Sequence, residues 1–256
     1  MNVLTSGDNR RAPVLQLMDE VGRMVDELGG ENPGDRPRHD TEILALFDRC
    51  RSLHASIRIL LEQGFVHEAI ILGRPLFTDS LALAEFADGS DHDRGSLAVG
   101  WILDSIQSLE RYYVVSRASG ADVWSELTKI GDQRREVQEY AARCGYRTRH
   151  WRPDEQVKEL AEKHGRAPEY GAHLITHMFV HGATTVTSER YVLDDDGKIR
   201  ISGVRPNRAL ERDAGLFAVN SMLHATRAAC TAFNWPEPKR LTTLWQELKN
   251  QITTPG

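Results

Sequence analysis

Four polar side chains recur at helical spacing near the middle of the second half of the chain. They are Tyr170, His173, His177 and His181, and at about 100° per residue they fall within roughly 80° of arc on one helix face. The residues between them are apolar enough for a core helix. Imidazole and phenol groups on a buried stripe can transfer protons or bind a metal ion. We therefore expect a functional site on this helix.

A metal centre is one interpretation of the stripe. His173 and His181 are eight residues apart, about 12 Å along a helix, too far for one ion with ligand bonds of about 2 Å. An ion could be shared only by His173 and His177 or by His177 and His181, as i, i+4 histidines do. Carboxylates would come from other helices, with Glu68, Asp79 and Glu85 as candidates, and the ExxH repeat of helical di-iron sites is missing. Core histidines bonded to neighbouring helices are the alternative, and we expect no cofactor.

A basic and aromatic segment precedes this helix. Residues 143–152 read RCGYRTRHWR, and we expect Arg147, Arg149 and Trp151 to contact a ligand. Arginines interleaved with aromatic rings are typical of surfaces that bind single-stranded nucleic acid or another anion. A solvated charged loop is the alternative interpretation.

Composition sets broad limits on the class of protein. The 256 residues carry a formal net charge of −5, which argues against a surface built for non-specific nucleic-acid binding. Three widely spaced cysteines without a CxxC pattern indicate a reducing compartment. No apolar run reaches the length of a membrane span, and no signal peptide is evident. The chain contains no GxSxG, Walker A or GxGxxG motif. We expect a cytoplasmic protein without membrane contact, and a homodimer stays open.

The elements that must position these residues are nearly all helical. After a polar N-terminus (1–12), residues 13–252 are expected to form one all-α bundle domain. Apolar periodicity and capping residues predict helices over 13–28, 40–63, 65–88, 97–117, 122–143, 153–164, 168–182, 207–233 and 239–251. Pro75 should kink the third helix near Leu72, and residues 89–96 read as a surface turn. Alternating residues around Asp196-Gly197 predict a β-hairpin insertion near 190–202.

Two of these segments resemble an uncharacterised bacterial all-helical family, catalogued as a domain of unknown function. The segments are LLEQGFVHEAIILGRPLF (60–77) and YGAHLITHMFVHG (170–182). The resemblance implies an all-α fold and pairs Arg74 with Tyr170 and His181 as candidate site residues. Members often carry Glu shortly after their Arg-Ser-Leu motif; here Thr78 and Asp79 stand in that place.

In general appearance the chain also resembles the HEPN group of helical toxin and defence proteins. This resemblance implies metal-independent RNA cleavage, with an Arg-x(4–6)-His motif supplying acid, base and phosphate contact. Three pairs in the chain match that motif, about as many as chance provides: Arg49/His54, Arg143/His150 and Arg166/His173.

The leading hypothesis is therefore a HEPN-like effector that acts on RNA through Arg74 and His181, with Tyr170 and His177 in support. A non-catalytic binding or scaffold protein is the second hypothesis. A metal-dependent oxidase or hydrolase using His177 and His181 is the third. Whether the protein is an enzyme stays open at this point.

Overall fold

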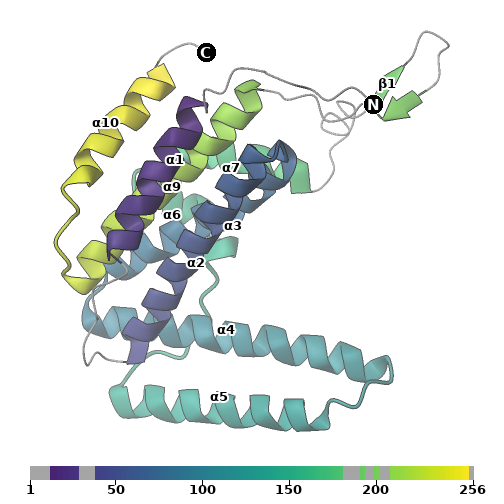
Figure 1. The fold of residues 1–256 in the computed structure, drawn as a ribbon. Coiled ribbons are helices and arrows are strands. Elements are labelled where there is room, and N and C mark those ends of the chain that lie inside the picture. Colours follow the sequence, from purple (N-terminus) through teal and green to yellow (C-terminus); the bar gives the residue numbers. More distant parts are fainter. Residues whose placement is uncertain (1–11, 29–37, 181–190, 194–198, 202–207, 254–256) are drawn as a thin grey trace.

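The computed structural model describes residues 12–28, 38–180, 191–193, 199–201 and 208–253. Over these residues the body of the protein is all-α, as the sequence predicts. The main bundle (Figure 1) is formed by α1 (Pro13–Leu28), α2 (Arg38–Glu62), α3 (Val66–Asp88), α7 (Ala167–Val180), α9 (Arg208–Phe233) and α10 (Arg240–Thr253). Of the predicted flexible stretch 1–12, only Ala12 belongs to the described residues.

Helix α3 is the central element of the bundle. It packs against α2 and α9 along its length and against α6 (Val157–Lys163) and α7 on a further side. Phe77, Leu81 and Phe86 of α3 are completely buried, which agrees with a sequence that is apolar almost all round. The helix continues through Pro75 from Val66 to Asp88.

Helices α4 (Asp91–Ala118) and α5 (Trp124–Cys144) form an antiparallel pair that lies across one end of the bundle (Figure 1). The prediction of a turn over 89–96 is wrong from Asp91 onward, because α4 begins there. Ser90 caps the helix: its Oγ accepts the Asp93 N–H at 3.2 Å, and acidic side chains in the first turn favour the positive end of the helix dipole.

The segment after α5 packs closely on α4 because α4 carries glycine at the contact points. A Cβ atom at Gly100 would lie 2.3 Å from the carbonyl oxygen of Arg149, and one at Gly95 would lie 2.3 Å from the Tyr146 ring. The segment then leads through a 3-10 turn (Pro153–Glu155) and α6 into α7. Two glycines on α4 therefore fix the path of the chain toward the predicted site.

Two three-residue strands lie within the segment 190–202. Strand β1 (Tyr191–Leu193) pairs antiparallel with β2 (Ile199–Ile201), with Tyr191 opposite Ile201. The predicted Asp196-Gly197 turn falls on residues 194–198, outside the described residues. Within the described ranges, no helix combines the length and the apolar character needed to cross a membrane.

Candidate functional site

The N-terminal half of α7 meets the middle of α3 through packed rings. The ring centres of Phe77 and His173 are 5.4 Å apart, and Tyr170 stacks on the His173 imidazole at 5.8 Å with the planes 19° apart. Phe77 and His173 are buried, and Tyr170 is half-buried. Ring pairs at these distances are favourable contacts. We call this surface, made by Phe77 and Ser80 of α3 with Arg166, Tyr170 and His173, the α3–α7 seam.

Arg166 closes the seam at the start of α7. Gly165 turns the chain there with a φ of +68°, a conformation that glycine adopts freely. The Arg166 side chain is 1% exposed; its guanidinium lies 4.6 Å over the Phe77 ring, and Nη1 donates to Ser80 Oγ at 2.6 Å. Its Nε and Nη2 have no hydrogen-bond partner among the described residues. Burial lowers the pKa of Arg166 to about 10, so the seam contains a charged guanidinium at neutral pH.

A polar network joins the first turn of α7 to α9. Asn220 Nδ2 donates to Glu169 Oε1 at 2.9 Å, and the same oxygen lies 3.9 Å from Arg166 Nε and 4.0 Å from His224 Nε2. Burial, and secondarily the positive charge of Arg166, lowers the pKa of His224 to about 3. The His224 imidazole is therefore neutral at physiological pH, and its ring meets the edge of Trp245 at 4.6 Å. These contacts fix the start of α7 against α9.

The next face of α3 buries a carboxyl group against α2. Asp79 is 6% exposed, and Arg49 Nε lies 3.1 Å from its Oδ2, an ion pair without the alignment of a hydrogen bond. Burial raises the pKa of Asp79 to about 6, although the Arg49 charge opposes the shift. Burial, with the nearby charge of Asp79, also raises the pKa of the Cys50 thiol. Asp79 is thus a buried carboxyl group whose pKa lies close to neutral pH.

Arg74 is the candidate site residue on α3. It is half-buried and stands one helical turn before Phe77, on the same helix face. The two helices run antiparallel, because Ser80 bonds to Arg166 while Phe77, earlier on α3, contacts the ring of His173, later on α7. Arg74 is therefore level with the part of α7 that follows His173.

The remaining two candidate catalytic residues, His177 and His181, follow His173 in the sequence. His177 belongs to α7, one turn after His173, but its side chain and the whole of His181 lie outside the described residues. Arg74 and Tyr170 thus lie on two helices that pack together, to opposite sides of the Phe77–His173 contact along the helices, and the pairing of Arg74 with His181 stays a prediction. In the part of the chain that the structure describes, no three His, Cys, Asp or Glu side chains gather as they would around a metal ion.

The predicted ligand-binding loop lies against α4, away from the seam. Arg147 and Arg149 are exposed, and the Arg147 N–H donates to Ser96 Oγ at 3.1 Å. Trp151 is 7% exposed and meets Phe86 edge-on at 5.2 Å, so most of its ring belongs to the core. All three predicted residues line a hollow of about 480 Å³ next to Lys163.

The three Arg-x(4–6)-His pairs have different surroundings in the fold. Arg49 contacts Asp79, whereas His54 faces α1 from another side of α2. Of these pairs, Arg166 and His173 share a contact, since both lie against the Phe77 ring. Motif spacing does not single out Arg166, because the Arg166/His173 match is one of three in the chain, about as many as chance provides. Its position directly after a helix-ending glycine was the available signal that it begins a new helix.

Comparison with protein families matches residues 41–199, from α2 to the second strand, to a family described as a Family of unknown function (DUF5677). No curated protein and no solved structure matches the chain significantly. The matched residues include Arg74 on α3 and the whole of α7, the two segments that carry the resemblance found in the sequence. The match covers more than half of the chain, and the protein therefore belongs to this family of unknown function.

Proposed function

We propose that the α3–α7 seam is the active site of a metal-independent endoribonuclease of HEPN-like kind, acting in a bacterial toxin or defence setting. One observation carries the proposal: Tyr170 of α7 stacks on His173, which contacts Phe77 of α3 one helical turn after Arg74. A guanidinium, a phenol and imidazoles are groups that together can hold a phosphate and transfer protons around it.

The reaction needs one proton acceptor, one proton donor and a phosphate contact. The 2′-hydroxyl of RNA attacks the neighbouring phosphorus; the O2′–P bond forms and the P–O5′ bond breaks, leaving a 2′,3′-cyclic phosphate and a 5′-hydroxyl. Arg74 holds two phosphate oxygens, and His181 removes the O2′ proton. His177 returns a proton to O5′, and the Tyr170 hydroxyl donates a hydrogen bond to the phosphate.

Arg166 acts in this proposal as a positioning residue. It is buried and binds Ser80 of α3, so it fixes where α7 begins relative to α3. Displacing a catalytic group by about 1 Å is enough to slow a reaction strongly. The exposed loop arginines Arg147 and Arg149 supply additional positive charge for an RNA strand.

The test is cleavage of total RNA by the purified protein in the presence of EDTA. We expect products with 2′,3′-cyclic phosphate ends and a loss of about 100-fold or more in rate for His181→Ala and for Arg74→Ala. Arg111→Ala, at an exposed arginine of α4, is the matched control and should cleave like the original protein. Absence of cleavage, or equal cleavage by all four proteins, would overturn the proposal.

A non-catalytic binding or scaffold protein is the second candidate. Two hydrogen bonds favour this candidate: Arg166 donates to Ser80, and Asn220 donates to Glu169. The polar groups at the start of α7 thus already have partners inside the protein. In that case His181→Ala lowers the melting temperature without removing an activity. Measuring melting temperature beside RNA cleavage for the same variants separates the two candidates.

A further inference from the structure

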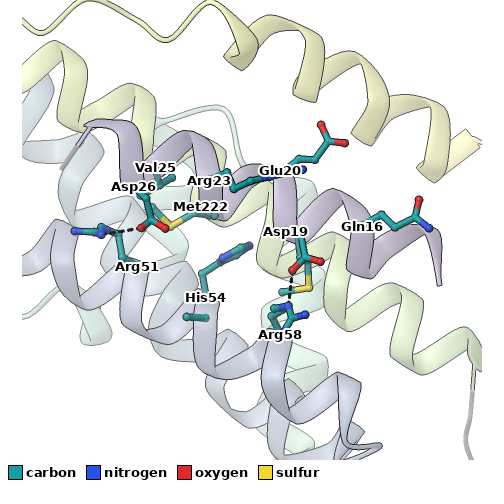
Figure 2. A pocket seen from close by; sticks show the side chains of 13 residues that line it. Gln16, Asp19, Glu20, Arg23, Val25, Asp26, Arg51, His54, Arg58 and Met222 are labelled. Atoms are coloured by element: carbon teal, nitrogen blue, oxygen red, sulfur yellow. Dashed lines mark hydrogen bonds and ion pairs between the residues drawn. The ribbon is translucent and has the colours of Figure 1, made fainter. Parts of the chain in front are cut away.

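A groove runs between α1 and α2, on a face of α2 that is separate from the α3–α7 seam. Its volume is about 670 Å³, within the range of pockets that hold small molecules. Figure 2 shows that charged side chains of both helices line it. Its apolar lining includes Met18, Val25 and Met222, all of which are buried. We call it the α1–α2 groove.

Two ion pairs span the groove. Arg58 Nε donates to Asp19 Oδ1 at 2.5 Å, and Arg51 Nη2 donates to Asp26 Oδ1 at 2.9 Å (Figure 2). The pairs are seven residues apart on each helix, so they stand about 10 Å apart along the groove. Between them on α1 is Gly22, where a Cβ atom would meet nothing within 4 Å. The space between the two pairs is therefore open and has the length of a small organic molecule.

His54 lies between the two ion pairs on α2. It is 4% exposed, it lines the groove, and its Nε2 has no hydrogen-bond partner among the described residues (Figure 2). The Nε of Arg51, one turn away, also has no acceptor in the described part of the chain. Leaving such buried polar groups without partners is unfavourable, and in folded proteins each calls for an explanation such as a bound ion or ligand.

The chemistry of these two atoms identifies the kind of partner they lack. An arginine Nε–H can only donate a hydrogen bond, and a neutral imidazole donates from Nε2 in one of its two tautomers. Burial lowers the pKa of His54 to about 4, so the ring is neutral at physiological pH. A group with two acceptor oxygens satisfies both donors together, which a cation or an apolar molecule does not.

We propose that the α1–α2 groove binds the carboxylate or phosphate group of a small organic molecule through Arg51 and His54. Arg23, on the groove wall, makes no ion pair with the residues that the structure describes and adds positive charge. The apolar lining receives the remainder of the molecule. The residues matched to the family begin at residue 41, so α2 from that residue onward, including Arg51 and His54, lies within the match and α1 lies outside it.

Asp26 competes with such a ligand for Arg51. Its side chain is 73% exposed, and ion pairs at that exposure contribute little to stability. A ligand oxyanion can therefore replace the Asp26 carboxylate on Arg51. It follows that removing the Asp26 charge should strengthen ligand binding, an effect that a purely structural ion pair does not predict.

The test is isothermal titration calorimetry of the full chain at pH 7.5 with benzoate and with phenyl phosphate, two probes that share an apolar ring. Sodium chloride at equal ionic strength is the reference. We expect saturable binding of at least one probe, and the tighter probe identifies the oxyanion as carboxylate or phosphate. Arg51→Gln should weaken binding about ten-fold or more, because a charge-assisted hydrogen bond is lost.

Asp26→Asn should tighten binding of the same probe several-fold, and this exposed substitution leaves the folded protein intact. Arg111→Gln, on α4, should leave the dissociation constant unchanged. Absence of saturable binding for both probes overturns the proposal. So does binding that Arg51→Gln and Asp26→Asn leave unaltered, because the probe then binds elsewhere.

Discussion

The guanidinium carbon of Arg166 lies 4.6 Å from the centre of the Phe77 ring, so one buried cation and one buried ring join the start of α7 to α3. A desolvated cation over an aromatic face is attracted by up to about 2 kcal/mol. The same guanidinium leaves two of its nitrogen atoms without partners among the described residues. The Arg166–Phe77 contact therefore has a favourable geometry, but hydrogen bonds compensate only part of the cost of burying the Arg166 charge.

Substitutions of Arg166 should separate these two effects. Arg166→Ala removes a buried side chain and its bond to Ser80, and we expect the free energy of unfolding to fall by about 3 kcal/mol. Arg166→Met keeps most of the volume and removes the buried charge, so its loss should be smaller, about 1 kcal/mol. Urea denaturation measures both. Arg111→Ala, on the exposed side of α4, should change stability by less than about 0.5 kcal/mol. If Arg166→Met lost as much stability as Arg166→Ala, this separation of the buried charge from the packing contact would be contradicted.

The Asp79 carboxyl should make stability fall as pH rises. Its pKa in the folded protein is about 6 against an ordinary value of 3.8, so between these values the folded state holds more protons than the unfolded state. Deprotonation is therefore unfavourable for folding, by about 2 to 3 kcal/mol once pH exceeds 6. Asp79→Asn should be more stable than the original protein at pH 7.5 and nearly equal to it at pH 4. Urea denaturation at each pH gives the free energy of unfolding of the original protein and of Asp79→Asn. The difference between these two free energies separates the contribution of Asp79 from that of the histidines.

His224 should have the opposite pH dependence. Its pKa is lowered from 6.5 to about 3 by burial, so below pH 6.5 the unfolded state takes up a proton that the folded state does not. Its contribution is present above pH 6.5 and declines by about 2 kcal/mol between pH 6.5 and 5. His224→Gln should flatten this part of the stability profile in chemical denaturation. An unchanged acid limb in the variant would show that the imidazole is not buried as described.

Gly100 should be intolerant of a side chain. A Cβ atom there would lie 2.3 Å from the Arg149 carbonyl oxygen, so Gly100→Ala must displace the loop that carries Arg147 and Arg149. We expect a loss of about 1 to 3 kcal/mol in thermal denaturation.

Gly131→Ala is the matched control for this substitution. The position is exposed in the middle of α5, and its Cβ would meet nothing within 4 Å. There alanine should stabilise the protein by up to about 1 kcal/mol. Equal effects of the two substitutions would argue against the close contact at Gly100.

Local pattern was enough to predict the helices and much of the core. The apolar spacing of α1 and the all-round apolar character of α3 are properties of short stretches of chain, because helical periodicity is local. The start of α4 was missed since residues 89–96 look like a turn by composition, and only the bond between Ser90 and Asp93 shows the cap. The family match confirmed the resemblance in residues 60–77 and 170–182. These segments could be recognised in the sequence because each is a short, local motif.

Which side chains of different helices contact one another was decided by the tertiary structure. Sequence spacing defines one face of one helix, but it does not say which neighbour that face contacts. Arg166 reaches Phe77 and Ser80 across 89 and 86 residues of chain, Asp79 is buried beside Arg49, and His54 opens onto α1. The burial that shifts the pKa values of Asp79, His54 and His224 comes from helices distant in sequence, so the folded structure alone determines their chemistry.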